Sequence, residues 1–184
     1  MLSPDETARL VRLVKQGQAD AFTILVCAYL RAVYAVALSI VGRPADAEDI
    51  AQDAFLKAFG SIDTCREPER FVGWLLQIAR NQARNLLDRR WLRDVAGEGA
   101  KVIEFATIPS AAAGQREDLL AALATLDERS RELVLLHDLE GWTHPEIAAA
   151  LDLSEELSRQ ILFRARRALR AKLDGAVPLE GSHG

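Results

Sequence analysis

Residues 46–59 read DAEDIAQDAFLKAF, and this stretch predicts a helix with two different faces. The apolar residues recur with the spacing of a helix that packs against a core; they are Ala47, Ile50, Ala51, Ala54, Phe55, Ala58 and Phe59. The opposite face carries Asp49, Gln52, Asp53 and Leu56, again at helical spacing. Surface helices usually mix charges of both signs, so a face with acids and an amide raises the question of its partner.

Length and composition indicate a globular chain. With 184 residues, 49% of them hydrophobic, it is long enough for one sizeable domain or two small ones. Charges interrupt each apolar run before it reaches the ~20 residues that span a bilayer. The N-terminus MLSPDETARL is polar and acidic, unlike the basic start of a signal peptide. We therefore expect a cytoplasmic protein.

No catalytic or metal-binding pattern stands out in the sequence. Cys27 and Cys65 occur singly, and His137, His144 and His183 are scattered, so neither a disulfide scaffold nor a metal site is predicted. The sequence contains no Ser-His-Asp set and no glycine-rich phosphate loop. We expect a protein that is not an enzyme, with no cofactor and no small-molecule substrate.

The net charge of −4 conceals three strongly charged segments. Residues 46–53 hold four acids and no base, whereas residues 80–93 hold five arginines against one aspartate. Residues 154–173 hold five arginines and one lysine against two glutamates. Phosphate attracts the two basic segments and repels the acidic one, which predicts two kinds of partner, one of them nucleic acid.

The periodic segments are all helical, and the predicted fold class is all-α with two small domains joined by a flexible linker. Ser3 to Glu6 form a capping box that opens the first helix, and a second helix spans residues 20–41. Residues 60–70 lack periodicity and predict a loop. The expected divisions are an N-terminal domain at 1–91, a linker at 92–115, a C-terminal domain at 116–173 and a disordered tail at 174–184.

Residues 141–169 predict a helix-turn-helix. Thr143 and Glu146 form a capping box for a short helix, Asp152 lies in the turn, and Ser154 caps a second helix that carries the basic cluster. A basic second helix after a tight turn is the arrangement that enters the DNA major groove. An ordinary helical hairpin with a solvated basic face remains the alternative.

Together these segments resemble the extracytoplasmic-function sigma factors of bacterial RNA polymerase, over about residues 18–173. DAEDIAQDAFLKAF followed by FVGWLLQIARNQARNLLDRR is similar to the family's second conserved region. LDERSRELVLLHDLEGWTHPEIAAAL followed by RARRAL is similar to its fourth. The resemblance implies that the chain binds core RNA polymerase and promoter DNA, and that an anti-sigma factor, often membrane-bound, controls it.

The resemblance also implies a role for each surface. The polymerase contacts would be Asp49, Gln52, Asp53 and Leu56. The promoter −10 element would meet the loop and the exposed face of the next helix, through Ser61, Ile62, Asp63, Thr64, Arg66, Arg70, Arg80, Asn81, Arg84 and Asn85. The −35 element would meet Thr143, Ser158, Arg159, Gln160, Arg164, Arg166 and Arg167. Phe71 and Trp74 are in step with Leu75 and Ile78, which favours core packing over DNA melting.

The predicted recognition helix departs from the family pattern at two positions. Ser158 replaces a usual core valine, and Ile161 replaces a usual DNA-facing arginine. Either the helix is rotated so that Leu157 and Ile161 are buried, or the reading of the −35 element is altered.

Two alternatives to a sigma factor are considered. One is a sigma-like mimic that sequesters an anti-sigma factor, and the other is a dimeric DNA-binding repressor, which leaves the acidic helix face unexplained.

Overall fold

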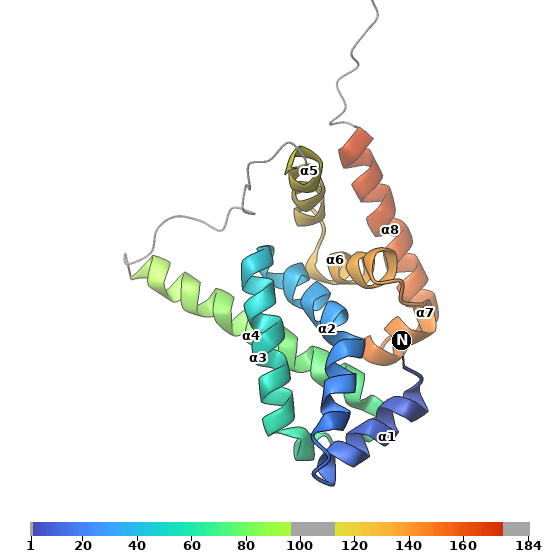
Figure 1. Cartoon of the computed structure of the whole chain (residues 1–184). Coiled ribbons are helices and arrows are strands. Elements are labelled where there is room, and N and C mark those ends of the chain that lie inside the picture. Colours follow the sequence, from blue (N-terminus) through green and yellow to red (C-terminus); the bar gives the residue numbers. More distant parts are fainter. Residues whose placement is uncertain (1, 97–112, 175–184) are drawn as a thin grey trace, which may run out of the picture.

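The computed structural model describes residues 2–96 and 113–174, and every long element in these two stretches is a helix (Figure 1). Residues 175–184 of the predicted tail and residues 97–112 of the predicted linker lie outside the described residues. The N-terminal helices are α1 (Pro4–Lys15), α2 (Asp20–Val41), α3 (Pro44–Gly60) and α4 (Phe71–Val95). The C-terminal helices are α5 (Ala113–Ala124), α6 (Glu128–Val134), a π-helical turn η3 (Leu135–Leu139), α7 (His144–Leu151) and α8 (Glu155–Asp174).

Local signals fix the ends of the N-terminal helices. The predicted capping box is present, because the Ser3 hydroxyl accepts from the Glu6 amide while the Glu6 carboxylate accepts from the Ser3 amide. Helix α2 ends at Gly42, whose φ of 69° is the left-handed conformation that glycine adopts without strain. Pro44 then opens α3 at a position where the missing amide hydrogen costs nothing. The predicted boundaries of α2 are therefore confirmed.

Helix α2 lies at the centre of the N-terminal domain and packs against α1, α3 and α4. The largest fully buried side chains of this core include Leu25, Tyr29, Phe71 and Leu75. The Tyr29 hydroxyl lies 2.6 Å from that of Thr7, which ties α2 to α1 and gives the buried phenol a polar partner. Burial raises the pKa of Tyr29. Phe71 is fully buried, as predicted.

Helix α2 is more apolar than the interrupted hydrophobic runs of the sequence suggested. Arg31 is the only charge in the long apolar stretch of this helix, which is long and apolar enough to cross a membrane by length and composition alone. However, 56% of this apolar stretch is buried within the protein, as in the core helix of a soluble protein. Packing within the domain therefore accounts for the apolar residues of α2.

Two helix ends differ from their predicted positions. Helix α4 continues to Val95 instead of ending near Trp91, because no glycine interrupts the chain until Gly97. Helix α5 begins at Ala113, within the predicted linker. The predicted loop at 60–70 contains two single turns of 3₁₀ helix, η1 (Ile62–Thr64) and η2 (Pro68–Arg70).

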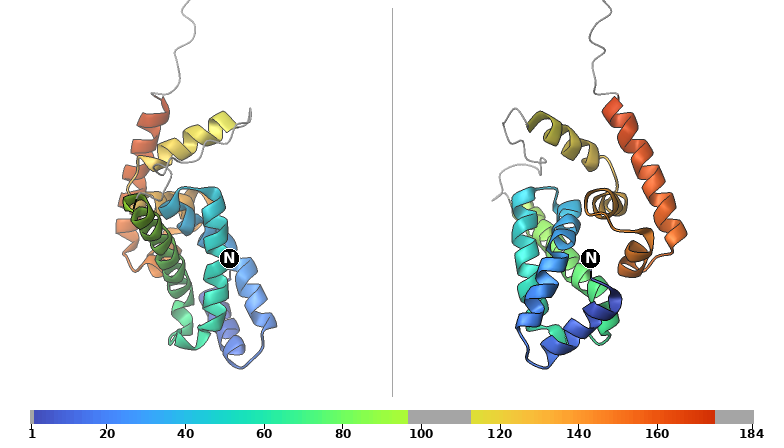
Figure 2. Two further views of the ribbon diagram at one scale, coloured as in Figure 1. Left: turned by 90° about the vertical axis from the view of Figure 1, so that its left-hand side faces the viewer. Right: turned by 45° about the vertical axis from the view of Figure 1, so that its right-hand side comes forward.

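Within the C-terminal part, α6, η3 and α7 pack against the N-terminal domain, whereas α5 and α8 extend away from it (Figure 2). Helix α6 contacts α2, and α7 contacts α4. The principal packing partners of helix α3 are two N-terminal helices, α2 and α4. The acidic helix α3 and the basic helix α8 therefore lie on different sides of the molecule, with α2, α6 and α7 between them (Figures 1 and 2).

Candidate protein-binding and DNA-binding surfaces

The acidic face of α3 is presented to solvent as the helical pattern predicted. Asp49, Gln52, Asp53 and Leu56 are all exposed, and 72% of the surface of Leu56 is accessible. The opposite face is held by buried contacts, including the edge-to-face packing of Phe55 on Phe22 at 6.2 Å. Phe59 differs from the expectation, because it remains half exposed although it packs on Phe22. The rigid helix thus offers carboxylates beside one large apolar side chain.

Asp46 begins the same acidic segment but has a structural role. Its two carboxylate oxygens each accept a 2.6 Å hydrogen bond from the Arg90 guanidinium, which joins the start of α3 to α4. These bonds hold the pKa of Asp46 below its ordinary value, and the charges of Arg90 and Arg43 act in the same direction. The four acids of residues 46–53 therefore divide into one structural acid and an exposed set.

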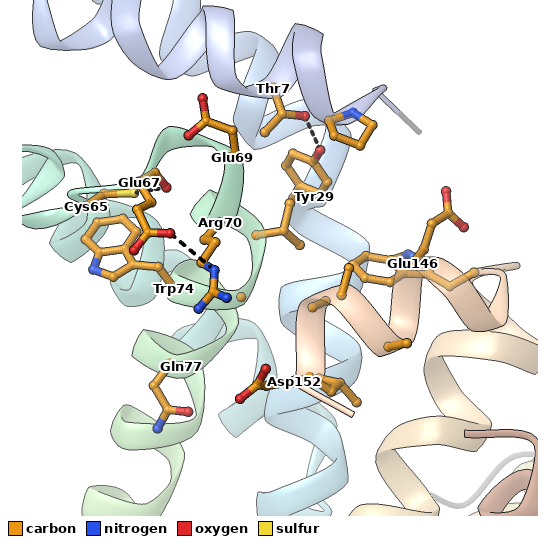
Figure 3. Close-up of a pocket in the computed structure, with 18 of the residues that line it drawn as sticks. Thr7, Tyr29, Cys65, Glu67, Glu69, Arg70, Trp74, Gln77, Glu146 and Asp152 are labelled. Atoms are coloured by element: carbon orange, nitrogen blue, oxygen red, sulfur yellow. Dashed lines mark hydrogen bonds and ion pairs between the residues drawn. The ribbon is translucent and has the colours of Figure 1, made fainter. Parts of the chain in front are cut away.

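The segment 61–70 borders a groove of about 940 Å³ between α1, α4 and α7 (Figure 3). Asp63, Thr64, Arg66 and Arg70 are exposed along this segment, and Ser61 is half-buried. Ile62 is buried in the core, so a direct DNA contact by its side chain is excluded in this conformation.

Three further side chains shape the segment and its groove. Lys15 anchors the segment by donating to the backbone carbonyl of Cys65 at 2.5 Å, and burial raises the pKa of the Cys65 thiol. Trp74 is half-buried and lines the groove, with its ring 5.8 Å from that of Phe71.

The basic face of α4 is only partly free. Asn81 and Asn85 are exposed as predicted. Arg80 was predicted to be exposed, but only 7% of its surface is accessible, because its Nε and one terminal nitrogen donate to Glu132 of α6 at 3.0 and 2.6 Å. Arg84 is half exposed and donates to Glu128 at 2.7 Å. The C-terminal domain thus covers Arg80 and engages Arg84.

The helix-turn-helix of α7 and α8 has the predicted local geometry. Thr143 and Glu146 form the capping box of α7. Asp152 ends α7 at φ 54° and is the one non-glycine residue with positive φ among the described residues. The hydroxyl of Ser154 accepts from the amide of Leu157 and so caps α8.

Ser158 is not a surface residue of α8, and the prediction that it contacts DNA is wrong for this conformation. None of its surface is accessible, and its hydroxyl lies 2.9 Å from Nδ1 of His144. This hydrogen bond gives the buried hydroxyl a partner at a core position. Leu157 stays exposed while Ile161 packs partly against the core, so the helix is not rotated to bury both.

The exposed face of α8 carries the remaining predicted DNA contacts. Arg159, Gln160, Arg164, Arg166 and Arg167 are exposed. Two of the arginines form ion pairs within the domain: Arg159 with Glu155 at 2.7 Å, and Arg166 with Asp138 by hydrogen bonds from Nε and a terminal nitrogen.

Phe163 is a candidate contact that the residue pattern missed. It is 70% exposed, lies four residues after Arg159 and precedes Arg164, so an apolar ring stands within a basic face.

Comparison with known families identifies the chain. A model of sigma-70 region 2 matches residues 25–93, and a model of sigma-70 region 4 matches residues 116–169. The chain belongs to the sigma-70 family. The first match covers the acidic helix and α4, and the second covers the helix-turn-helix.

Similarity to curated relatives places this sigma factor in the extracytoplasmic-function group. It is 30% identical to the ECF RNA polymerase sigma-E factor of Escherichia coli K12, over 91% of this chain and 94% of the relative. It is 37% identical to the probable RNA polymerase sigma factor RfaY of Xanthomonas campestris pv. campestris, over 85% of this chain, and spans 41% of that protein's length. A solved structure of CnrH in complex with the cytosolic domain of CnrY is 28% identical, with a TM-score of 0.69 over 94% of this chain and 99% of CnrH.

Sigma factors are transcription initiation factors. Among the described residues, no group of three or more histidine, cysteine, aspartate or glutamate side chains is placed to hold a metal ion.

Proposed function

We propose that this sigma factor uses the exposed face of α3 to bind core RNA polymerase. The observation that carries the proposal is the alignment of Asp49, Gln52, Asp53 and Leu56 on one rigid, solvent-exposed helix. Carboxylates held on a helix set the register and the association rate with a basic partner, and an exposed leucine among them adds apolar contact area. The match to sigma-70 region 2, which includes α3, supports the polymerase as the partner of this face.

The two DNA-binding roles fall to different domains under this proposal. The segment 61–70 and the exposed part of α4 contact the −10 element, and the outer face of α8 contacts the −35 element. Exposed Arg66, Arg70 and Asn81 support the first role, and exposed Arg164 and Arg167 support the second. The chain supplies recognition and strand opening, and acts as a cytoplasmic initiation factor rather than as an enzyme.

An anti-sigma factor is the proposed regulator. The resemblance implies such a partner, and CnrH was solved with a second protein, CnrY. The groove between α1, α4 and α7 is lined by residues of both domains, including Trp74, Trp142 and the alanines at 148–150 of α7. Residues of both domains therefore meet in a site that suits a helical segment.

The decisive binding test replaces Asp49 and Asp53 with alanine and measures association with core polymerase. Because both acids are exposed, we expect the variant to fold normally and to bind at least about tenfold more weakly at low salt. The matched control is Asp5→Asn with Asp20→Asn, which changes the charge equally on α1 and α2. Equal binding by the wild type, the variant and the control would exclude the acidic face as the polymerase contact.

A further inference from the structure

Helix α1 precedes the residues that match sigma-70 region 2, yet it packs directly on the segment 61–70. The match begins at residue 25, and α1 ends at Lys15. The helix packs against α2 and against both 3₁₀ turns of the segment, η1 and η2. The segment is the proposed −10 surface, so an element outside the matched residues supports a surface inside them.

Helix α1 is itself firmly held, which makes it a rigid support. Val11 and Val14 are buried in the core, and the Thr7 hydroxyl ties the helix to Tyr29 of α2. The capping box at Ser3 closes the first turn. Side chains on such a helix hold a more precise position than side chains on a loop.

The second half of the segment has no apolar anchor of its own. Ile62 and Cys65 are the buried residues of the segment, and each of residues 66–70 is exposed or half-buried. One backbone bond closes η2, in which the Arg70 amide donates to the Glu67 carbonyl at 2.9 Å, and the two side chains also pair at 3.3 Å (Figure 3). Neither contact attaches the segment to the rest of the domain. Polar contacts with α1 supply that attachment.

Two basic side chains of α1 reach the segment. Lys15 donates to the backbone carbonyl of Cys65 at 2.5 Å, and Arg12 pairs with Glu69. Both members of the Arg12 pair are more than half exposed, so solvent screens the pair and it contributes little. Lys15 is half-buried and its acceptor belongs to a buried residue, so this charge-assisted hydrogen bond is the stronger anchor.

The carbonyl that Lys15 holds belongs to the peptide unit between Cys65 and Arg66. Because a peptide unit is planar, fixing this carbonyl also fixes the direction in which the chain enters Arg66. Arg66 and Thr64 flank Cys65, and both are exposed and are proposed contacts of the −10 element. Recognition requires side chains held within about 0.5 Å of the productive geometry, so the placement of this peptide affects which base is accepted.

We propose that Lys15 is a positioning residue for promoter recognition, which sets the base preference at the −10 element by holding the Cys65 carbonyl. This role rests on the proposed −10 contact of the segment. Lys15 acts through the segment and not through its own charge on DNA. A lysine that contacts a phosphate raises the affinity for all sequences about equally, whereas a positioning lysine changes the choice between bases.

Three variants of the full chain separate the contact from the charge. Lys15→Met removes the ammonium group and keeps a long unbranched side chain, whereas Lys15→Arg keeps a charged donor. Arg9→Met is the matched control, because Arg9 is exposed on the same helix six residues before Lys15. It removes the same charge without removing the contact. Circular dichroism and urea midpoints establish that each variant is folded.

The first measurement uses the buried Cys65 thiol to report whether the segment is held in place. Cys27→Ser in every protein leaves Cys65 as the only thiol, and its reaction with a thiol reagent requires local opening of the segment. We expect Lys15→Met to accelerate this reaction at least about tenfold, the change that corresponds to the loss of one charge-assisted hydrogen bond. Loss of the Lys15 charge alone acts in the opposite direction, because this charge limits the rise in the pKa of the Cys65 thiol. Acceleration therefore reports detachment of the segment.

The second measurement is the base preference at the −10 element in transcription in vitro with core polymerase. The templates are a pool made from one promoter that the wild type uses, with the −10 element randomised, and the transcripts are sequenced. We expect Lys15→Met to change the ratio between preferred and rejected bases at least about fivefold at one or more positions, which is the discrimination that a single base contact supplies. Lys15→Arg restores most of the wild-type preference, and Arg9→Met keeps it.

Two results would overturn the positioning role. If Lys15→Met keeps the wild-type base preference, the role is overturned, whether or not transcription falls equally for all sequences. A changed preference with unchanged reactivity of Cys65 would assign a direct base contact to Lys15, and would overturn positioning as well.

A separate variant distinguishes this failure from failure of the proposed function. Thr64→Ala with Arg66→Ala changes the base preference if the segment reads the −10 element. A change in this variant without one in Lys15→Met removes the positioning role alone. An unchanged preference in Thr64→Ala with Arg66→Ala, or no transcript with the wild type, removes the proposed −10 role and the positioning role together.

Discussion

Replacing Asp46 with asparagine separates the structural acid of α3 from its exposed acids. The change removes the charge and one of the two 2.6 Å hydrogen bonds to Arg90, and leaves an amide oxygen that accepts the other. A charge-assisted hydrogen bond contributes roughly 1.5–3 kcal/mol, exposed ion pairs contribute about 0–1, and breaking a fully buried pair costs about 3–5. The Asp46 and Arg90 side chains are 15% and 21% exposed, which places the expected loss near 2 kcal/mol.

Urea unfolding followed by circular dichroism measures this loss. With a slope of about 2 kcal/mol per molar urea, the midpoint of Asp46→Asn falls by about 1 M at pH 7. Asp49→Asn, three residues along the same helix but exposed, changes the midpoint by less than about 0.3 M. The two variants are expected to have the opposite effects on polymerase binding: Asp49→Asn weakens binding, and Asp46→Asn leaves it unchanged as long as the protein is folded.

The pH dependence gives the same prediction a second test. The pKa of Asp46 is lower in the folded protein than in the unfolded chain, so its stabilisation is complete above the ordinary aspartate value of about 4. As the pH falls through the lower folded value, the unfolded chain binds the proton first and the stabilisation is lost. The difference between wild type and Asp46→Asn therefore shrinks below about pH 4. Equal midpoints at pH 7, or a difference that is undiminished in acid, would refute the structural role of the pair.

Three further changes test other parts of the structure. Asp152→Gly relieves the strain of the left-handed backbone at φ 54° and raises the free energy of unfolding, measured by urea titration, by up to about 1 kcal/mol. A destabilised variant would show that the Asp152 side chain stabilises the fold in addition to occupying the turn. Thr143→Ala removes the capping box of α7 and lowers the free energy of unfolding by about 1 kcal/mol, whereas no change would show that the cap is dispensable. Exposed Cys27 reacts with a thiol reagent in a fast phase, whereas Cys65 reacts slowly because it is buried and its raised pKa keeps the thiol protonated. Cys27→Ser therefore abolishes the fast phase, and a fast phase that persists in this variant would place Cys65 at the surface.

Much of the fold was predictable because local signals determine it. The capping boxes at Ser3 and Thr143, the left-handed turn at Asp152 and the end of α2 at Gly42 each depend on a few neighbouring residues. The exposed face of α3 follows from helical periodicity alone. These features were read correctly from the residues that form them.

The roles of Arg80 and Ser158 depended on contacts between distant segments. Periodicity places Arg80 on the outer face of α4, and only the docking of α6 buries it against Glu132, 52 residues away in the sequence. Ser158 replaces an expected core valine, yet it stays at the core position because His144 supplies a hydrogen-bond partner. The sequence separates each of these pairs, and no local pattern indicates that they meet.

The measurement that tests sigma activity most directly is transcription in vitro of fragments of the source genome by core RNA polymerase, with and without this protein. Sequencing the 5′ ends of the transcripts identifies each start site. We predict a set of start sites that require the protein and share sequence elements near −35 and −10, and this set is lost with Asp49→Ala and Asp53→Ala. If no start site depends on the protein and core polymerase does not bind it, the chain is not an active sigma factor, in contradiction to the account.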